Sequence, residues 1–145
     1  MCNIASNVGT EELAHLEIVA SIVRQLTKGL SAKQLEEAGF APYYIDHTAA
    51  IWPQAAGGIP FNACEFQSKG DPITDLTEDL AAEQKARTTY DNILRLVKDP
   101  EVCDPIRFLR EREIVHFQRF GEGLRMIQED LDSKNFYAFN PDFDM

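Results

Sequence analysis

Hydrophobic and polar positions repeat with helical periodicity along three long segments of the chain. The first stripe begins near Met1 and recurs every three or four residues, at Val8, Glu12, His15, Val19, Ile22 and Leu26. This spacing places all of its members on one face of an α-helix. Gly29 can end that helix, and Ser31 can cap a short helix that runs through Ala38 and stops at Gly39. The pattern therefore predicts a long helix followed by a short one.

Two further stripes predict two more long helices. One helix is expected from Ile73 to about Lys98, before Pro100, with its stripe at Leu76, Leu80, Glu83, Arg87, Tyr90, Leu94 and Val97. The other is expected to begin near Asp104, because Asp104 and Pro105 can serve as N-cap and first helical residue. Its stripe comprises Ile106, Leu109, Glu113, His116, Phe120, Ile127 and Leu131. The fold class is therefore all-α.

The remaining segments are predicted to be irregular: a connection between helices and a C-terminal tail. Residues 40–72 are rich in glycine and proline and form a long crossover, and residues 134–145 form an aromatic, irregular tail. With 145 residues, the chain is expected to be one domain with one core. No signal peptide or membrane-spanning segment is expected.

Charge and cysteine content exclude several classes of function. Fourteen lysines and arginines stand against 24 aspartates and glutamates, a net charge of -10, which disfavours binding to nucleic acid and to anionic membranes. The three cysteines are Cys2, Cys64 and Cys103, an odd number that argues against a disulfide framework. We expect a reducing, cytoplasmic environment, with Cys64 and Cys103 buried as small hydrophobic residues.

The polar interruptions of the stripes are the candidate chemistry. They are Glu12 and His15 in the first stripe, Glu83 in the second, and Glu113 and His116 in the third. A carboxylate on a core-facing position is costly unless it is paired or coordinates a metal. In each Glu-x-x-His pair the two side chains share one helix face, so both can reach one metal centre. The five residues together predict a metal site.

Such pairs are typical of dimetal carboxylate sites in ferritin-like bundles, where two helices supply Glu-x-x-His and two supply a single Glu. This chain has two helices of the first kind and one of the second. In ferritin-like bundles the long connection joins helix two to helix three, and here the crossover follows the first long helix. The three long helices therefore correspond to helices two, three and four of an up-down bundle. We expect the first helix and its glutamate to be absent.

Simpler interpretations exist for single residues. Any one Glu or His could be a solvated side chain, and His47 is expected to have a surface or loop role. Arg87 could neutralise charge beside the site or pair with an ordinary carboxylate. The run Arg107–Arg112 reads as a solvated or intersubunit face.

Three sequence blocks carry a resemblance to a known family. They are Gly9-Thr10-Glu11-Glu12-Leu13-Ala14-His15-Leu16-Glu17, Asp79-Leu80-Ala81-Ala82-Glu83-Gln84-Lys85-Ala86-Arg87 and Arg110-Glu111-Arg112-Glu113-Ile114-Val115-His116. The chain resembles the manganese catalase family over essentially its whole length. It is most similar to the short spore-coat branch, which shares Gly70-Asp71-Pro72 and Phe136-Tyr137-Ala138-Phe139-Asn140-Pro141.

The resemblance implies a role for each site residue. Glu12 would bridge two metal ions, His15 would bind one of them, and Glu83 and His116 would bind the other. Glu113 matches a carboxylate that does not bind metal and is the candidate for proton transfer. Some branches carry an arginine at the position of Ala82.

The implied cofactor is a pair of manganese ions, although carboxylate and imidazole ligands suit iron as well. The implied reaction is disproportionation of hydrogen peroxide, impaired if the first-helix glutamate is missing. A structural subunit of the spore coat is the alternative, and an iron-storage or oxidase role is a weaker one. An open apolar groove beside Val8 and Leu80 would need covering by the tail, by the crossover near Ile51 and Trp52, or by a second copy, so we expect a homo-oligomer.

Overall fold

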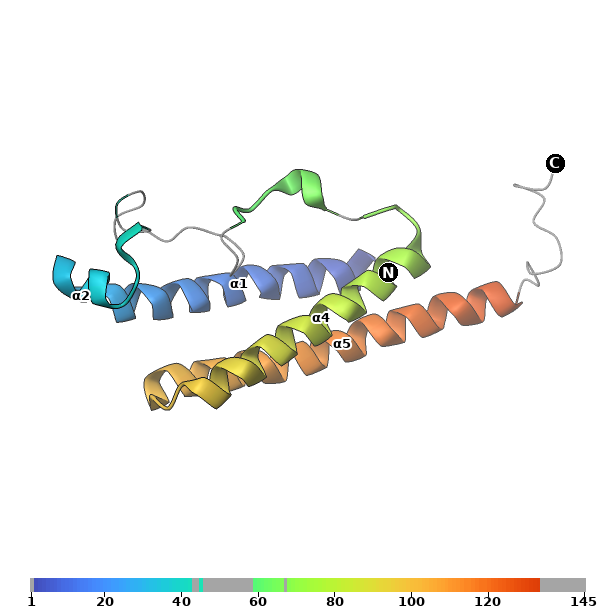
Figure 1. Cartoon of the computed structure of the whole chain (residues 1–145). Helices are drawn as coiled ribbons and strands as arrows, with labels where there is room; N and C mark the ends of the chain where they lie inside the picture. The colour runs from blue at the N-terminus through green and yellow to red at the C-terminus, as the bar shows by residue number, and fades with distance from the viewer. Residues whose placement is uncertain (1, 43–44, 46–58, 67, 134–145) are drawn as a thin grey trace. The chain divides into compact units, whose positions relative to one another are not determined.

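The computed structural model describes residues 2–42, 45, 59–66 and 68–133, and its long elements are all α-helices (Figure 1). The elements are α1 (Cys2–Thr27), α2 (Ala32–Glu37), the short 3-10 helix η1 (Ala63–Glu65), α4 (Pro72–Leu96) and α5 (Pro100–Ser133). This confirms the all-α class of a ferritin-like helical bundle. None of the helices in these ranges is long and apolar enough to cross a membrane.

The ends of α1 and α2 follow the predicted cap residues. Gly29 and Gly39 have φ angles of 79° and 77°, the left-handed conformation that terminates helices. Ser31 caps α2: the Gln34 amide donates to Ser31 Oγ at 3.3 Å, and the Ser31 amide donates to Gln34 Oε1 at 2.9 Å. This reciprocal capping box fixes the start of α2.

The start of α4 is held by two aspartates. Asp71 is the N-cap, with Oδ1 accepting a hydrogen bond from the Thr74 amide at 2.7 Å, and Pro72 follows it. One turn on, the Asp75 carboxylate accepts hydrogen bonds from the amides of Lys69 and Gly70 at 2.8 and 3.0 Å. The amides of Thr74 and Lys69 lower the pKa of Asp71 and of Asp75, respectively. The preceding loop is thereby tied to α4.

The predicted start of the third long helix is wrong by about one turn. The helix α5 begins at Pro100, and Pro105 lies inside it. Asp99 supplies the cap, because its Oδ1 accepts from the Glu101 amide at 2.9 Å and its carbonyl accepts from the Cys103 amide at 2.8 Å. Asp99-Pro100 and Asp104-Pro105 are both Asp-Pro pairs that can begin a helix. The helix begins at the earlier pair. Pro105 removes only one hydrogen bond from the ladder.

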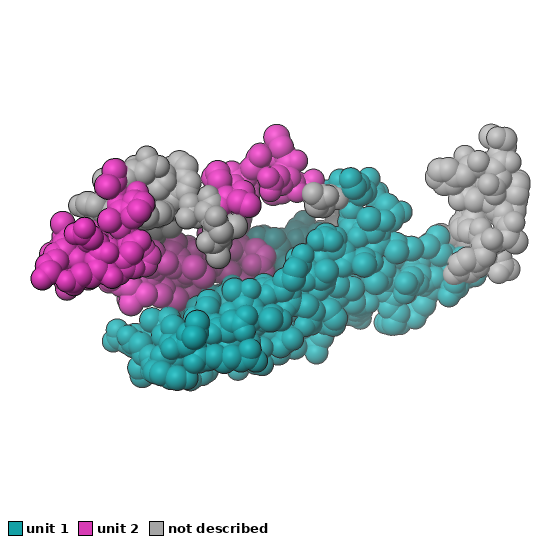
Figure 2. All heavy atoms as spheres, in the orientation of Figure 1, with its two compact units in different colours: residues 1–10, 67–145 teal, residues 11–66 magenta. Residues whose placement is uncertain are grey.

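The chain divides into two compact units (Figure 2). Unit 1 comprises residues 1–10 and 67–145, and unit 2 comprises residues 11–66. In unit 1, α4 packs along α5, and the start of α1 joins their core. The core residues are Val8, Leu76 and Phe120, with Ile4, Leu80, Leu124 and Ile127 around them.

The start of α1 and α4 both lie against α5 at Gly123. A Cβ atom added at Gly123 would lie 3.4 Å from Ile4 Cδ1 and 3.8 Å from Leu76 Cδ1. Both distances are ordinary van der Waals contacts, so a methyl group fits there.

One prediction of cysteine burial is wrong, and several predicted features lie outside the described residues. Cys103 is buried as expected, whereas Cys64 is exposed within η1, so its predicted burial is wrong. The residues His47, Ile51 and Trp52 and the tail from residue 134 lie outside the described residues.

Candidate metal centre

The helix α5 presents one continuous buried face. Ile106, Leu109, Glu113, His116 and Phe120 are all at most 5% exposed. They follow one another at three- or four-residue intervals, as the sequence predicts. Glu113 and His116 therefore sit in the middle of an apolar stripe, with 2% and 0% exposure.

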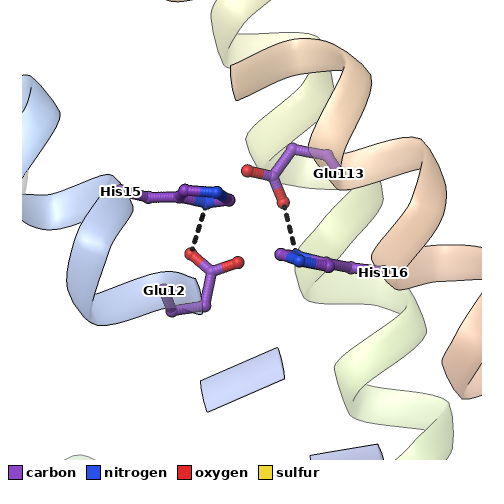
Figure 3. Close-up of side chains that lie close together, drawn as sticks. All are labelled: Glu12, His15, Glu113 and His116. Atoms are coloured by element: carbon purple, nitrogen blue, oxygen red, sulfur yellow. Dashed lines mark ion pairs between the residues drawn. The ribbon is translucent and has the colours of Figure 1, made fainter. Parts of the chain in front are cut away.

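The neighbouring helix α4 adds a third polar group to this position. Glu83 is 7% exposed, and its Oε2 lies 3.7 Å from His116 Nδ1. Glu113 Oε2 lies 3.7 Å from the same nitrogen, as the dashed line in Figure 3 shows. The packing of α4 on α5 thus brings together Glu83, Glu113 and His116, three of the five predicted residues.

The other two predicted residues form a pair on α1, in unit 2. Glu12 Oε2 lies 3.3 Å from His15 Nδ1, and both side chains project from adjacent turns of one helix (Figure 3). His15 is buried, whereas the Glu12 side chain is 43% exposed. The pair follows directly from the i, i+3 spacing, which places both residues on one face.

The donor atoms in both places suit a transition metal. Carboxylate oxygens and imidazole nitrogens are ligands for manganese and iron, and no soft thiolate is among them. In unit 1, two buried carboxyl groups stand beside one imidazole, an excess of negative charge that a metal cation can balance. The chemistry of the residues therefore fits a bound divalent cation.

Arg87 pairs with a carboxylate of its own helix and not with the candidate metal-binding residues. Its Nη1 donates to Asp91 Oδ2 at 3.0 Å, and its Nε donates to Gln84 Oε1 at 3.0 Å. The interpretation as a partner of an ordinary carboxylate is confirmed.

Asp91 is a residue that sequence analysis missed. Its Oδ1 accepts a hydrogen bond of 2.5 Å from Arg110 Nε, which links α4 to α5. The Arg110 hydrogen bond, with the charges of the nearby arginines, lowers the pKa of Asp91. Nineteen residues separate Asp91 from Arg110, so no local spacing indicates the contact.

Within the predicted arginine cluster, Arg107 pairs with Asp104 one turn away. Arg107 is exposed, and Arg110 is partly buried against α4. Two arginines of the cluster thus form ion pairs, Arg107 with α5 and Arg110 with α4. The exposure of Arg107 agrees with the predicted solvated face.

The chain is similar in sequence to manganese catalases and to a related Bacillus protein. A family model described as manganese containing catalase matches residues 3–136. Protein CotJC of Bacillus subtilis is 47% identical over 134 residues, which cover 92% of this chain and 71% of CotJC. A probable manganese catalase of Clostridium acetobutylicum is 30% identical over 90% of this chain and 58% of its own length. The manganese catalase of Lactiplantibacillus plantarum is 25% identical, and the match covers 51% of it.

Proposed function

The chain belongs to the manganese-containing catalase family, and from that premise we propose that it binds two manganese ions and disproportionates hydrogen peroxide. The observation that carries the proposal is the buried group of Glu83, Glu113 and His116 on α4 and α5. The chain spans little more than half of the related manganese catalases, so the activity of the whole enzyme is part of the proposal.

We assign the metal ligands as the family resemblance suggests. Glu12 bridges the two ions, His15 binds one, and Glu83 and His116 bind the other. Glu113 remains outside the ligand set. Iron is the competing metal, because the same oxygen and nitrogen donors accept it.

The reaction converts two molecules of hydrogen peroxide into two of water and one of dioxygen. Bound manganese ions would supply the two-electron redox change. The burial of Glu113 and His116 on α5 would limit the access of bulk water to the reacting peroxide. Oxidation of one peroxide to dioxygen releases two protons and two electrons, and reduction of the other peroxide to two waters consumes them. Glu113 would accept and return one of these protons, and water would carry the other.

A second candidate function is structural. The identity to CotJC exceeds the identity to the manganese catalases, and the sequence resembles the spore-coat branch. In that case the chain is a building block of the spore coat whose metal site contributes stability and little turnover.

The test combines metal content with oxygen evolution. We expect purified protein to contain manganese and to lose it in His15→Ala and in His116→Ala. Glu113→Gln should keep the metal and release dioxygen more slowly. Glu78→Gln, an exposed carboxylate paired with Lys85 on α4, is the control and should match the wild type.

The outcomes separate the two functions. Metal-loaded protein that evolves no dioxygen would support the structural subunit. Unchanged metal content in both histidine variants would refute the assigned ligands.

A further inference from the structure

The carboxylate of Asp91 joins arginines of two helices. Its Oδ2 accepts a hydrogen bond from Arg87 Nη1 on α4 at 3.0 Å, and its Oδ1 accepts one from Arg110 Nε on α5 at 2.5 Å. Arg87 is held in turn by Gln84, because its Nε donates to Gln84 Oε1 at 3.0 Å. With both oxygens engaged by charged donors, the carboxylate has a fixed orientation. We call Arg87, Asp91 and Arg110 the Asp91 link.

The Asp91 link lies beside the buried group of Glu83, Glu113 and His116. The helix α4 packs along α5 (Figure 1). Arg87 follows Glu83 by four residues on α4, and Arg110 precedes Glu113 by three residues on α5. Each arginine is therefore about one helical turn from a buried carboxyl group. Both turns lead toward the connection between α4 and α5, so the Asp91 link is on that side of the group.

Apolar packing holds the two helices on the opposite side of the group. Leu76 and Phe120 share the core there, and a Cβ atom added at Gly121 would lie 3.8 Å from Leu80 Cδ2. Within α4, the buried residues are Leu76 and Glu83, so no side chain of this helix after Glu83 is buried. The Asp91 link supplies a directional contact between the helices in this less buried half of α4.

The two carboxyl groups beside His116 depend differently on helix packing. Glu113 and His116 lie three residues apart on α5, so the helix itself sets their 3.7 Å contact. The 3.7 Å contact of Glu83 Oε2 with His116 Nδ1 depends on how α4 is placed against α5. A rotation of α4 about its axis would move Glu83 and leave Glu113 beside His116.

We propose that Asp91 is a positioning residue of the metal centre: by joining Arg87 to Arg110, it fixes the rotation of α4 that keeps Glu83 beside His116. The inference rests on the proposed function, in which Glu83 and His116 bind one metal ion. Asp91 does not touch the metal and acts only through Glu83.

The expected effect is on metal affinity. Removing a group that orients a metal ligand commonly weakens metal binding by about 10- to 100-fold. Asp91 is eight residues from Glu83 on α4, which is about 12 Å along the helix. Because Asp91 acts over two turns, we expect a loss at the lower end of that range, about tenfold.

Manganese titration of the full chain tests the proposal, with the electron paramagnetic resonance signal of free manganese(II) giving the dissociation constant. Asp91→Ala and Arg110→Ala should each weaken binding about tenfold. The double variant should be within about threefold of either single variant, because all three lose the same contact. Asp91→Glu keeps the negative charge and both acceptor oxygens, and should recover binding to within about threefold of the wild type.

Asp104→Ala is the matched control. It also removes one negative charge and one aspartate–arginine pair, but its partner Arg107 lies on the same helix. We expect it to bind manganese like the wild type. Urea denaturation of each metal-free variant separates the two kinds of effect, because a purely structural Asp91 would change stability and leave the affinity of the folded protein unchanged. If Asp91→Ala does not fold, Arg110→Ala provides the same comparison with Asp104→Ala.

The outcomes distinguish this proposal from the proposed function. Manganese binding by the wild type, with Asp91→Ala or Arg110→Ala as tight as Asp104→Ala, would overturn the positioning role alone. Additive losses in the double variant, or no recovery in Asp91→Glu, would do the same. A wild-type chain that binds no manganese would overturn both proposals.

Discussion

The two Glu-x-x-His pairs have the same spacing and different environments. On α1, Glu12 and His15 pair at 3.3 Å, and the Glu12 side chain is 43% exposed. On α5, Glu113 and His116 are almost completely buried, and Glu83 of α4 joins them. A helix alone is sufficient to bring a Glu and a His together. Burial and a third carboxyl group require a packed neighbour, which α4 provides.

The difference indicates what each pair contributes. Buried carboxylates are costly to leave uncompensated, so the α4–α5 group depends most on a bound cation. The α1 pair is less completely buried, because 43% of the Glu12 side chain is exposed, so leaving it without metal should cost less. The following predictions test that contrast, in order of decreasing effect.

The largest effect should come from the core that supports the α4–α5 group. Phe120→Ala removes a ring from the cluster of Val8 and Leu76 and should lower the free energy of unfolding by about 3–5 kcal/mol. Phe108→Ala, a half-exposed phenylalanine on the same helix, should cost less than about 1 kcal/mol. Urea denaturation of metal-free protein measures both. Equal losses would contradict the location of the core.

Metal addition should stabilise the protein only when both pairs are intact. At a manganese concentration a hundred times the dissociation constant, the wild type should gain about 2.7 kcal/mol. We expect His116→Ala and His15→Ala each to abolish this gain, because both residues are assigned as ligands. The measurement is the unfolding free energy with and without manganese. If His15→Ala kept the full gain, the α4–α5 group would bind metal alone.

A smaller effect is expected at Gly9 on α1, the helix that carries Glu12 and His15. Gly9 lies inside α1, and an added Cβ meets no atom within 4 Å. Gly9→Ala should therefore raise the free energy of unfolding by about 0.8–1 kcal/mol, the difference in helix propensity. At Gly123 the added Cβ would make ordinary van der Waals contacts with Ile4 and Leu76, so Gly123→Ala should also be tolerated. A clear loss of stability in Gly123→Ala would contradict the packing of Ile4 on α5.

The smallest effect should come from the partly exposed link between α4 and α5. The Arg110 hydrogen bond holds the pKa of Asp91 below its usual value, so this contact stabilises the fold above the ordinary aspartate pKa. Its contribution should disappear as the pH falls through the lowered pKa of the folded state. Asp91→Asn should be less stable than the wild type at neutral pH, and the difference should shrink in acid. Thermal unfolding across this range measures it, and a difference independent of pH would exclude the charge as the cause.

Much of the fold follows from local signals in the sequence. The periodic stripes predicted the three long helices, and the predicted helix ends at Gly29, Ser31 and Gly39 agree with the structure. The start of α5 was misjudged because Asp99-Pro100 and Asp104-Pro105 are equally good local caps. Only the whole helix distinguishes them, since the earlier start adds Val102 and Cys103 to the buried face.

For the candidate site, the sequence by itself determined which residues can act and how they are grouped on each helix. The spacing of Glu12 with His15 and of Glu113 with His116 sets their pairing, because three residues make almost one turn of a helix. The tertiary structure decided that Glu83 meets His116, that Arg110 meets Asp91, and that Cys64 is exposed. Contacts between helices and burial depend on how distant segments pack, and periodicity within one helix carries no information about the partner that covers it.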